Sequence, residues 1–323
     1  MRKTLYVGDP HVTIGNLAES ARLLDFVEET VKNEKVDKLV ILGDLMHNHA
    51  IIRAEVHLFW IKYLGKFADM IRTIVLVGNH DVTSDKHNNI HSLEGIKLYN
   101  KPLLTIVDSP LAEDNIVYLP YMHDKAQFVE VANSLSSSGN TLVCHEDWDG
   151  AQYENGFYCP NGVKQEDVKF KLIIAGHTHK RSRFGKIILP GTARWLTASD
   201  ANHEKGLWLV DHNEDGSIFS ERFIDTSHVC TPIVSFTWNE GEEQPIIPEG
   251  SRATVELIGS SNWISKKKVL LKGKAGIKSK ITDKQKPTNR KIGNGLEDFL
   301  SNLYQSTVNK KALLDYAKEI GIV

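Results

Sequence analysis

Five short apolar runs, each followed by glycine or a polar residue, constrain the fold of this chain more than any other feature. They cover residues 5–7, 39–42, 74–77, 141–143 and 172–175. Runs of this length, rich in β-branched residues, predict buried strands. In an open α/β sheet the ligand-binding crevice lies beyond the carboxyl ends of the strands. The polar residues that follow the runs are therefore expected to converge on one cleft: Asp9, His11, Asp44, Asn79, His80, His145, His177 and His179.

Apolar residues at helical spacing lie between the first of these runs. Positions 17–31 and 56–67 carry apolar side chains every three or four residues, which predicts a helix in each segment. Further along the chain, residues 206–211 and 217–224 read as strands that are joined through an Asp-Gly turn. Alternating strands and helices, followed by a hairpin, predict an α/β fold in which layered sheets are flanked by helices.

The residue pattern changes after residue 228, and it predicts three further segments. Residues 229–265 contain short strand patterns, which predict a small β-rich domain. Residues 266–291 are basic and predict a linker. Residues 292–323 carry two short amphipathic helical patterns. These helices either dock on the main domain, residues 1–228, or present a groove to a partner.

Charge is distributed unevenly, although the formal net charge is only −2 for the 323 residues. Residues 266–291 carry eleven lysine or arginine residues against one acidic residue, Asp283. Such a segment can contact a polyanion such as DNA, or it can be a solvated basic linker. The candidate DNA-binding residues are Lys266, Lys267, Lys268, Lys272 and Lys274.

The cysteine pattern indicates a reducing compartment. Cys144, Cys159 and Cys230 are odd in number and far apart, which argues against a disulfide framework and against a structural zinc site. No apolar export signal follows Met1, and no uninterrupted apolar run reaches the roughly 18 residues that a membrane span needs. We therefore expect a cytoplasmic protein that does not enter a membrane.

The donor types in the expected cleft point to metal chemistry. Aspartate carboxylates, an asparagine carbonyl and histidine imidazoles are present without a thiolate, a set that suits Mn²⁺, Fe²⁺ or Zn²⁺ better than Ca²⁺. The donors are too many for one tetrahedral ion. Two divalent ions that share a bridging carboxylate fit the number, and such pairs bind a phosphate and activate water.

The order of the motifs carries a family resemblance. DxH, GD, GNHD, a histidine at a strand end and GHxH follow one another, and this order resembles the calcineurin-like metallophosphoesterases. The resemblance implies Asp9, His11 and His179 as ligands of one metal, and Asn79, His145 and His177 as ligands of the other, with Asp44 bridging. It also implies that His80 approaches the phosphate and stabilises or protonates the leaving oxygen. Asp81 is then expected to orient His80.

Two further motifs narrow the resemblance to the DNA double-strand-break repair nucleases of the SbcD type. His47, three residues beyond Asp44, matches a histidine that helps to place the DNA backbone in that group; its alternative reading is a loop or helix-cap residue. Residues 189–192 and 204–206 resemble the PGS and EKG stretches of the same group. Cys144 departs from the glycine that relatives often have before the histidine, which puts the local loop shape in doubt.

This narrower resemblance implies an activity, a cofactor and partners. The chain is expected to be a Mn-dependent DNA exonuclease and endonuclease subunit that acts in DNA end processing, recombination and repair. It looks most like a bacteriophage-encoded version of such a subunit. Residues 229–265 then form a capping domain, and residues 292–323 bind an SMC-like ATPase of the SbcC type. A homodimer within a heterotetramer is expected. Its compartment is the cytoplasm, which is that of the host if the protein is phage-encoded. Two other readings stay open: a phosphoesterase for small phosphoesters or phosphoproteins, and a non-catalytic scaffold on the same fold.

Overall fold

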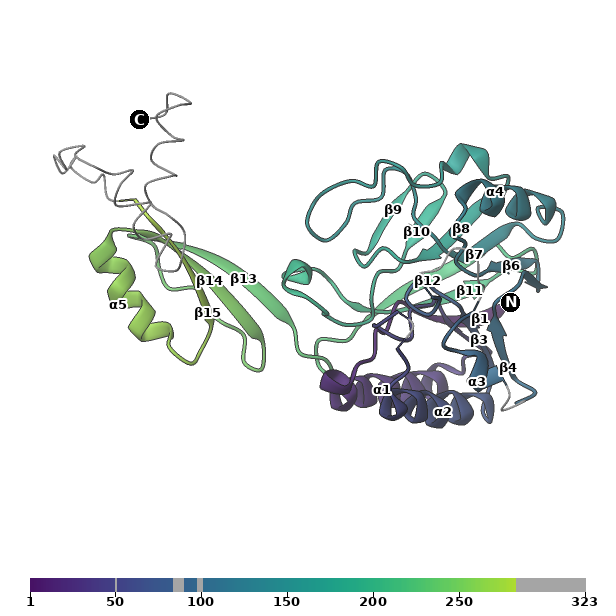
Figure 1. Ribbon diagram of the computed structural model, residues 1–323, viewed down its shortest axis with the longest axis horizontal. Helices are drawn as coiled ribbons and strands as arrows, with labels where there is room; N and C mark the ends of the chain where they lie inside the picture. The colour runs from purple at the N-terminus through teal and green to yellow at the C-terminus, as the bar shows by residue number, and fades with distance from the viewer. Residues whose placement is uncertain (50, 84–89, 98–100, 283–323) are drawn as a thin grey trace, which may run out of the picture.

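Two six-stranded sheets form the main body of the protein, and a three-stranded sheet is set apart from it (Figure 1). The computed structural model describes residues 1–49, 51–83, 90–97 and 101–282. Helices cover the outer faces of the two large sheets (Figure 1). The α/β fold with layered sheets is therefore as the sequence predicts.

The first sheet has the strand order β12-β11-β1-β2-β3-β4. Its strands are β1 (Arg2–Val7), β2 (Lys38–Ile41), β3 (Arg72–Leu76), β4 (Leu104–Val107), β11 (Gly206–His212) and β12 (Ile218–Asp225). Strands β1 to β4 are parallel, and the register pairs Val7 with Ile41 and Ile41 with Val75. The loops after β1, β2 and β3 therefore begin at the same level of the sheet.

The second sheet has the order β5-β6-β7-β8-β10-β9. Its strands are β5 (Leu111–Glu113), β6 (Ile116–Leu119), β7 (Thr141–His145), β8 (Leu172–Gly176), β9 (Ser182–Phe184) and β10 (Ile187–Leu189). Strands β7 and β8 are parallel, and His145 pairs with Gly176 in the register. The end of β7 and the loop after β8 therefore lie side by side.

Apolar side chains from both sheets fill the space between them, and helices close the two outer faces. The layer between the sheets includes Tyr6, Ile74, Val143, Ile174 and Trp208, all of them buried. α1 (Leu17–Glu34) and α2 (Ala54–Ala68) lie along one side of the main body, and α4 (Lys125–Ser134) lies along the opposite side (Figure 1). The remaining short helices are α3 (Glu94–Lys97), η1 (Ile14–Asn16), η2 (Gln165–Asp167) and η3 (Ala198–Asp200).

The part that is set apart, which we call the capping unit, comprises residues 233–281. It contains the parallel strands β13 (Ile233–Asn239), β14 (Arg252–Gly259) and β15 (Gly276–Ile281), together with α5 (Ser261–Leu271). Its own core includes the buried residues Trp238, Val255, Leu257, Ile264 and Leu271.

The predicted boundary at residue 265 and the predicted basic linker are wrong for residues 266–282. This segment contains most of α5 and the whole of β15. Ile264 and Leu271 are seven positions apart and so lie on one helix face, which packs on the sheet, while Lys266 and Lys268 are exposed. Residues 283–291 of the predicted linker, and the predicted helices in 292–323, lie outside the described residues.

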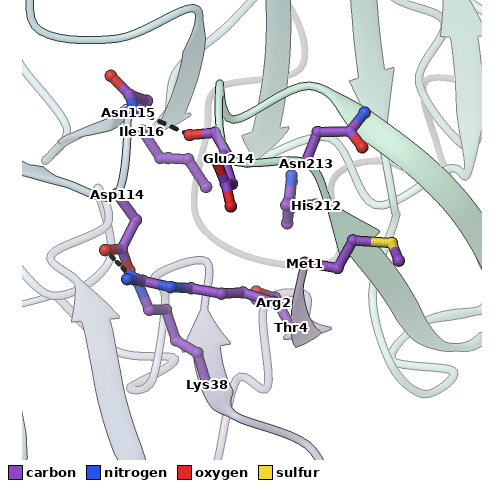
Figure 2. A pocket seen from close by; sticks show the side chains of 10 residues that line it. All are labelled: Met1, Arg2, Thr4, Lys38, Asp114, Asn115, Ile116, His212, Asn213 and Glu214. Atoms are coloured by element: carbon purple, nitrogen blue, oxygen red, sulfur yellow. Dashed lines mark hydrogen bonds and ion pairs between the residues drawn. The ribbon is translucent and has the colours of Figure 1, made fainter.

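A cavity of about 310 Å³ opens between the two large sheets at the amino-terminal ends of β1 and β2 (Figure 2). Arg2, Lys38 and Asp114 line it, and no predicted metal ligand is among its lining residues. The Lys38 ammonium donates to Asp114 at 2.8 Å and lies 2.7 Å from Glu113, so it ties the first sheet to the β5–β6 turn of the second. None of the helices in the described part of the chain is long and apolar enough to span a membrane.

Candidate metal centre

The predicted metal ligands come together at the carboxyl ends of five strands. They follow or end β1, β2 and β3 of the first sheet and β7 and β8 of the second, and the strand registers align the loops within each sheet. Most of them are buried, with 0–2% of the surface exposed for Asp9, His11, Asp44 and His145. Residues that are up to 170 positions apart in the chain thus share one site.

One part of this site brings His11 and His179 together beside the carboxylates of two aspartates, Asp44 and Asp9. The Nε2 atoms of His11 and His179 lie 3.1 Å apart. His11 Nε2 is also 3.4 Å from Asp44 Oδ2. Asp9 accepts a hydrogen bond from the His177 amide at its Oδ2 atom, whereas its buried Oδ1 atom has no hydrogen-bond partner among the described residues. A buried carboxylate oxygen without a donor is costly unless a cation compensates it.

The other part of the site is formed around the Asn79 side chain. Its carbonyl oxygen lies 2.9 Å from His145 Nε2 and 2.7 Å from His177 Nδ1. His145 Nε2 is 3.4 Å from Asp44 Oδ1. The two oxygens of Asp44 therefore face the two groups of ligands, one each, as a bridging carboxylate requires.

The electrostatics of the site fit a pair of divalent cations. Burial lowers the pKa of His11 well below 6.5, which favours the neutral imidazole that binds metals. Burial also lowers the pKa of His145, but the Asp44 and Asp9 carboxylates outweigh it and raise that pKa to about 10. The carboxylates thus attract positive charge at this position, where a metal ion and a proton would compete.

The backbone at the site is strained. Asp9, His11, Asp44 and His177 have positive φ angles of 25°, 44°, 52° and 79°. Non-glycine residues rarely adopt such angles, each costing on the order of 1–3 kcal/mol, and they persist where the surrounding structure enforces them, often at functional sites. Four predicted ligands are held in this conformation, which indicates that ligand placement takes precedence over local stability.

Comparison with known proteins agrees with this geometry. Residues 2–181, more than half of the chain, match the calcineurin-like phosphoesterase family. The chain belongs to this family. The matched segment contains all seven predicted ligands. Calcineurin-like phosphoesterases bind a dinuclear metal centre, and the Asp and His groups described above are the residues of this chain that fit it.

Three viral proteins have similar sequences. "Putative phosphoesterase 244L" of Invertebrate iridescent virus 6 is 25% identical over 66% of this chain and 77% of its own length. "Exonuclease subunit 1" of Enterobacteria phage T4 is 24% identical, over 67% of each chain. "Putative phosphoesterase 078R" of Invertebrate iridescent virus 3 is 23% identical over 58% of this chain and 56% of its own length.

A solved phosphoesterase from E. coli, Yfce, is also similar. It is 16% identical in sequence and superposes with a TM-score of 0.32. The superposition covers 69% of this chain and the whole of the bacterial one.

Two acidic residues of the loop after β7 contact two predicted ligand histidines of this calcineurin-like phosphoesterase. Asp147 Oδ1 lies 3.1 Å from His177 Nε2, and Glu154 Oε1 lies 3.4 Å from His179 Nδ1. Tyr153 donates to Asp147 at 2.8 Å. Carboxylates of this kind fix the ring orientation of metal-binding histidines. Sequence reasoning missed both acids, although an aspartate two residues after a ligand histidine was a usable signal.

His47 and His80 lie at the rim of the site, beside the predicted ligand His11. The nearest nitrogen atoms of His11, His47 and His80 all lie within 4.8 Å of one another. The His80 amide donates to Asp44 Oδ1 at 2.8 Å, which ties the GNHD loop to the bridging carboxylate. His49 was given no role from sequence, but its ring stacks on His80 with centroids 4.2 Å apart.

The prediction that Asp81 orients His80 is wrong. The buried Asp81 carboxylate accepts hydrogen bonds from the amides of Gly78 at 3.0 Å and Met46 at 3.0 Å. It therefore ties together the loops after β2 and β3. His80 is instead oriented by the main-chain carbonyl oxygen of His47, which lies 2.6 Å from its Nδ1 atom.

The predicted DNA-binding lysines lie on the capping unit rather than at the metal centre. Lys266 and Lys268 are located on α5, and Lys266 is exposed. Lys272 and Lys274 follow the helix. Lys267 differs, because its ammonium lies 4.5 Å from the centroid of the Trp238 ring and is occupied by this contact. Whether the group binds DNA stays a prediction.

Proposed function

We propose that this calcineurin-like phosphoesterase is a DNA nuclease subunit of the SbcD type. It would hydrolyse phosphodiester bonds in DNA with two divalent ions, Mn²⁺ in our proposal. The observation that carries the proposal is His47, whose side chain meets His11 and His80 at the rim of the metal centre. The phage T4 relative, which is described as an exonuclease subunit, supports the same reading.

The residues of the site suit phosphate chemistry. Two ions held by Asp44 and the surrounding ligands would polarise the phosphate and lower the pKa of a bound water towards neutrality. A carbonyl oxygen only accepts hydrogen bonds, so the Nδ1 atom of His80 carries a proton. When His80 is protonated, its Nε2 atom donates as well and can give a hydrogen bond or proton to the leaving sugar oxygen.

Two exposed aromatic side chains on the loop that carries Glu154 fit a substrate with bases. Phe157 and Tyr158 are 73% and 63% exposed, and they lie on the loop from which Glu154 reaches His179. Aromatic side chains offer a stacking surface to any base, worth about 1–3 kcal/mol per base. A small phosphate monoester would not use such a surface, so this observation favours a polynucleotide.

An assay on two substrates tests the proposal. Wild-type protein with Mn²⁺ is given end-labelled linear duplex DNA and, separately, a chromogenic phosphate monoester. We expect DNA cleavage that His47→Ala reduces selectively for exonucleolytic cutting. His228→Ala removes an exposed histidine whose ring packs against Phe26 of α1, and it serves as the control. Monoester turnover without DNA cleavage would instead support a small-molecule phosphoesterase. No Mn²⁺-dependent turnover of either substrate would support the scaffold.

The partners are part of the proposal. We propose that the subunit forms a homodimer and binds an SMC-like ATPase of the SbcC type through residues 292–323, which lie outside the described residues. Co-expression with such an ATPase, followed by size-exclusion chromatography, tests this. Full-length protein should co-elute with the ATPase, and a variant that ends at residue 282 should not. Co-elution of the shortened variant would contradict the assignment of the binding segment.

A further inference from the structure

The segment 190–194 lies between two of the ligand-bearing loops. The amide of Ala193 donates to the Gly8 carbonyl at 3.1 Å, next to Asp9. The amide of Thr192 donates to the His179 carbonyl, also at 3.1 Å. A Cβ atom on Gly8 would lie 1.9 Å from the Gly191 carbonyl oxygen, so only glycine permits this approach. The segment therefore joins the β1 loop to the β8 loop.

Lys205 lies beneath this junction with a fully buried side chain. Its ammonium donates to the His179 carbonyl at 2.8 Å, to Thr192 Oγ1 at 2.7 Å and to Asp200 Oδ1 at 2.5 Å. These three bonds use all three protons of the ammonium group. One of them ends on the main chain of a predicted metal ligand.

A gain in folding stability does not by itself explain the buried ion pair between Lys205 and Asp200, because removing two charges from water costs free energy. Neither side chain is exposed, and apolar residues of similar volume often replace a buried ion pair without loss of stability. The other oxygen of Asp200 accepts from the amides of Leu196 at 2.9 Å and Thr197 at 2.8 Å. Asp200 is thus anchored on both sides, which fixes the ammonium of Lys205 in one place.

Arg194 donates to the main-chain carbonyl of His11, just as Lys205 donates to that of His179. The guanidinium is buried and donates to the carbonyl oxygens of Pro10 at 3.2 Å and His11 at 3.0 Å. The hydroxyl of Thr192 donates to the Arg194 carbonyl at 2.9 Å and accepts from Lys205. Asp200, Lys205, Thr192 and Arg194 therefore form one continuous group of contacts, which we call the support network.

The two histidines that the support network holds belong to the same half of the metal centre. The Nε2 atoms of His11 and His179 are 3.1 Å apart. The histidines of the other half are held differently, His145 by the Leu42 carbonyl at 2.7 Å and His177 by Asp147 at 3.1 Å. The support network thus acts on one of the two predicted ion sites.

We propose that Lys205, Thr192 and Arg194 are positioning residues that set the main-chain placement of His11 and His179, and so the affinity of one ion site. The inference explains why the chain carries the Pro-Gly-Thr and Glu-Lys-Gly motifs at 190–192 and 204–206. The inference rests on the dinuclear metal centre of the family and does not depend on DNA as the substrate. The positioning role can therefore fail while the proposed nuclease activity holds, and the reverse.

Thr192 offers the sharpest test because its hydroxyl can be removed at nearly constant volume. Thr192→Val deletes the hydroxyl, and Thr192→Ser restores it. Mn²⁺ binding is followed by calorimetry, and the paired or single state of the ions by EPR, since two neighbouring Mn²⁺ spins couple. We expect Thr192→Val to weaken the binding of one of the two Mn²⁺ ions by about 10- to 100-fold and to lose the EPR spectrum of the coupled pair. Thr192→Ser should bind both ions and keep that spectrum.

Lys205→Met provides an independent second variant, and Lys186→Met is its matched control. Lys186 also donates to a main-chain carbonyl, that of Val168, but this carbonyl is not in a ligand loop. We expect selective loss of one ion in the first variant and wild-type binding in the second. If Lys205→Met does not fold without metal, the two Thr192 variants decide. Wild-type affinity for both ions in Thr192→Val, or an equal loss of both, would overturn the proposal.

Discussion

The Nδ1 atom of His80 lies 2.6 Å from the main-chain carbonyl oxygen of His47. The rings of the two residues are nearly parallel, with centroids 5.7 Å apart. The loop after β2 therefore orients the histidine that follows β3 through its backbone. Because a His47→Ala variant keeps this carbonyl, it removes the imidazole of His47 without releasing His80, and the two roles can be measured separately.

We expect His80→Ala to lower kcat by about 10²- to 10⁴-fold, the usual contribution of a general acid or base. The reason is the loss of Nε2, the ring nitrogen of His80 that the His47 carbonyl does not occupy. Mn²⁺ affinity should stay close to wild type, because His80 is not a predicted ligand. Steady-state kinetics and Mn²⁺ calorimetry on the same preparation check this. Undiminished turnover would show that His80 takes no part in the reaction.

Asp147→Asn should weaken Mn²⁺ binding by about 10- to 100-fold, the usual effect of losing a carboxylate behind a ligand histidine. Asp147 lies 3.1 Å from His177 Nε2. Burial raises the pKa of the Asp147 carboxyl, but the contact with His177 outweighs burial and lowers this pKa to about 2. Asp149→Asn, two residues further along the same loop, is the matched control. Equal Mn²⁺ affinity of both variants in calorimetry would contradict a supporting role for Asp147.

The double substitution of Phe157 and Tyr158 by alanine should weaken binding of DNA ends by about 1–3 kcal/mol for each base that stacks on them. Turnover of a phosphate monoester should not change, because a monoester has no base. Phe219, 64% exposed on β12, is the control for the loss of an exposed aromatic ring. Fluorescence anisotropy with a labelled DNA end measures the effect. An equal loss on both substrates would indicate damage to the metal centre.

Residues of the metal centre could be predicted from sequence where a recognisable motif directly follows a predicted strand. Asp44 and Asn79 each follow an apolar run, so the parallel sheet had to bring them together. Asp147 lies two residues after the predicted ligand His145, a signal that sequence reasoning could have used, whereas Glu154 could not be predicted because its contact depends on the path of a loop. The fold of α5 was hidden for another reason: its apolar stripe consists of few residues among lysines, and composition alone suggested a linker.

The acid stability of the metal-free protein should depend on Glu113. Burial raises the pKa of Glu113, but hydrogen bonds from Arg72 and Lys38 outweigh it and hold the pKa below 4.5. A carboxyl whose pKa is lower in the folded state stabilises the fold above its unfolded pKa, and this contribution is lost as pH falls through the folded pKa. Glu113→Gln should therefore flatten the decline in unfolding free energy below about pH 5.

Urea unfolding at several pH values, with chelator present, measures this dependence. Glu29→Gln, on the helix α1, is the control and should follow the wild-type curve. The substitution replaces only the Glu113 carboxyl with an amide, so the change in slope reports on that carboxyl. A Glu113→Gln curve that runs parallel to the wild-type curve would show that the interaction contributes equally in both protonation states.

The lysines of α5 should differ from one another in what they do. The Lys267 ammonium lies 4.5 Å from the Trp238 ring and 5.8 Å from the Trp263 ring, an interaction worth on the order of 0.5–2 kcal/mol. Lys267→Met should therefore lower the stability of the capping unit and leave the salt dependence of DNA binding nearly unchanged. Lys266→Met and Lys268→Met should show the reverse, because each lysine that no longer neutralises a phosphate reduces the slope of log K against log salt by about 0.9. DNA binding at several salt concentrations separates the two effects, and an unchanged slope after Lys266 and Lys268 are both neutralised would remove α5 from the DNA-binding surface.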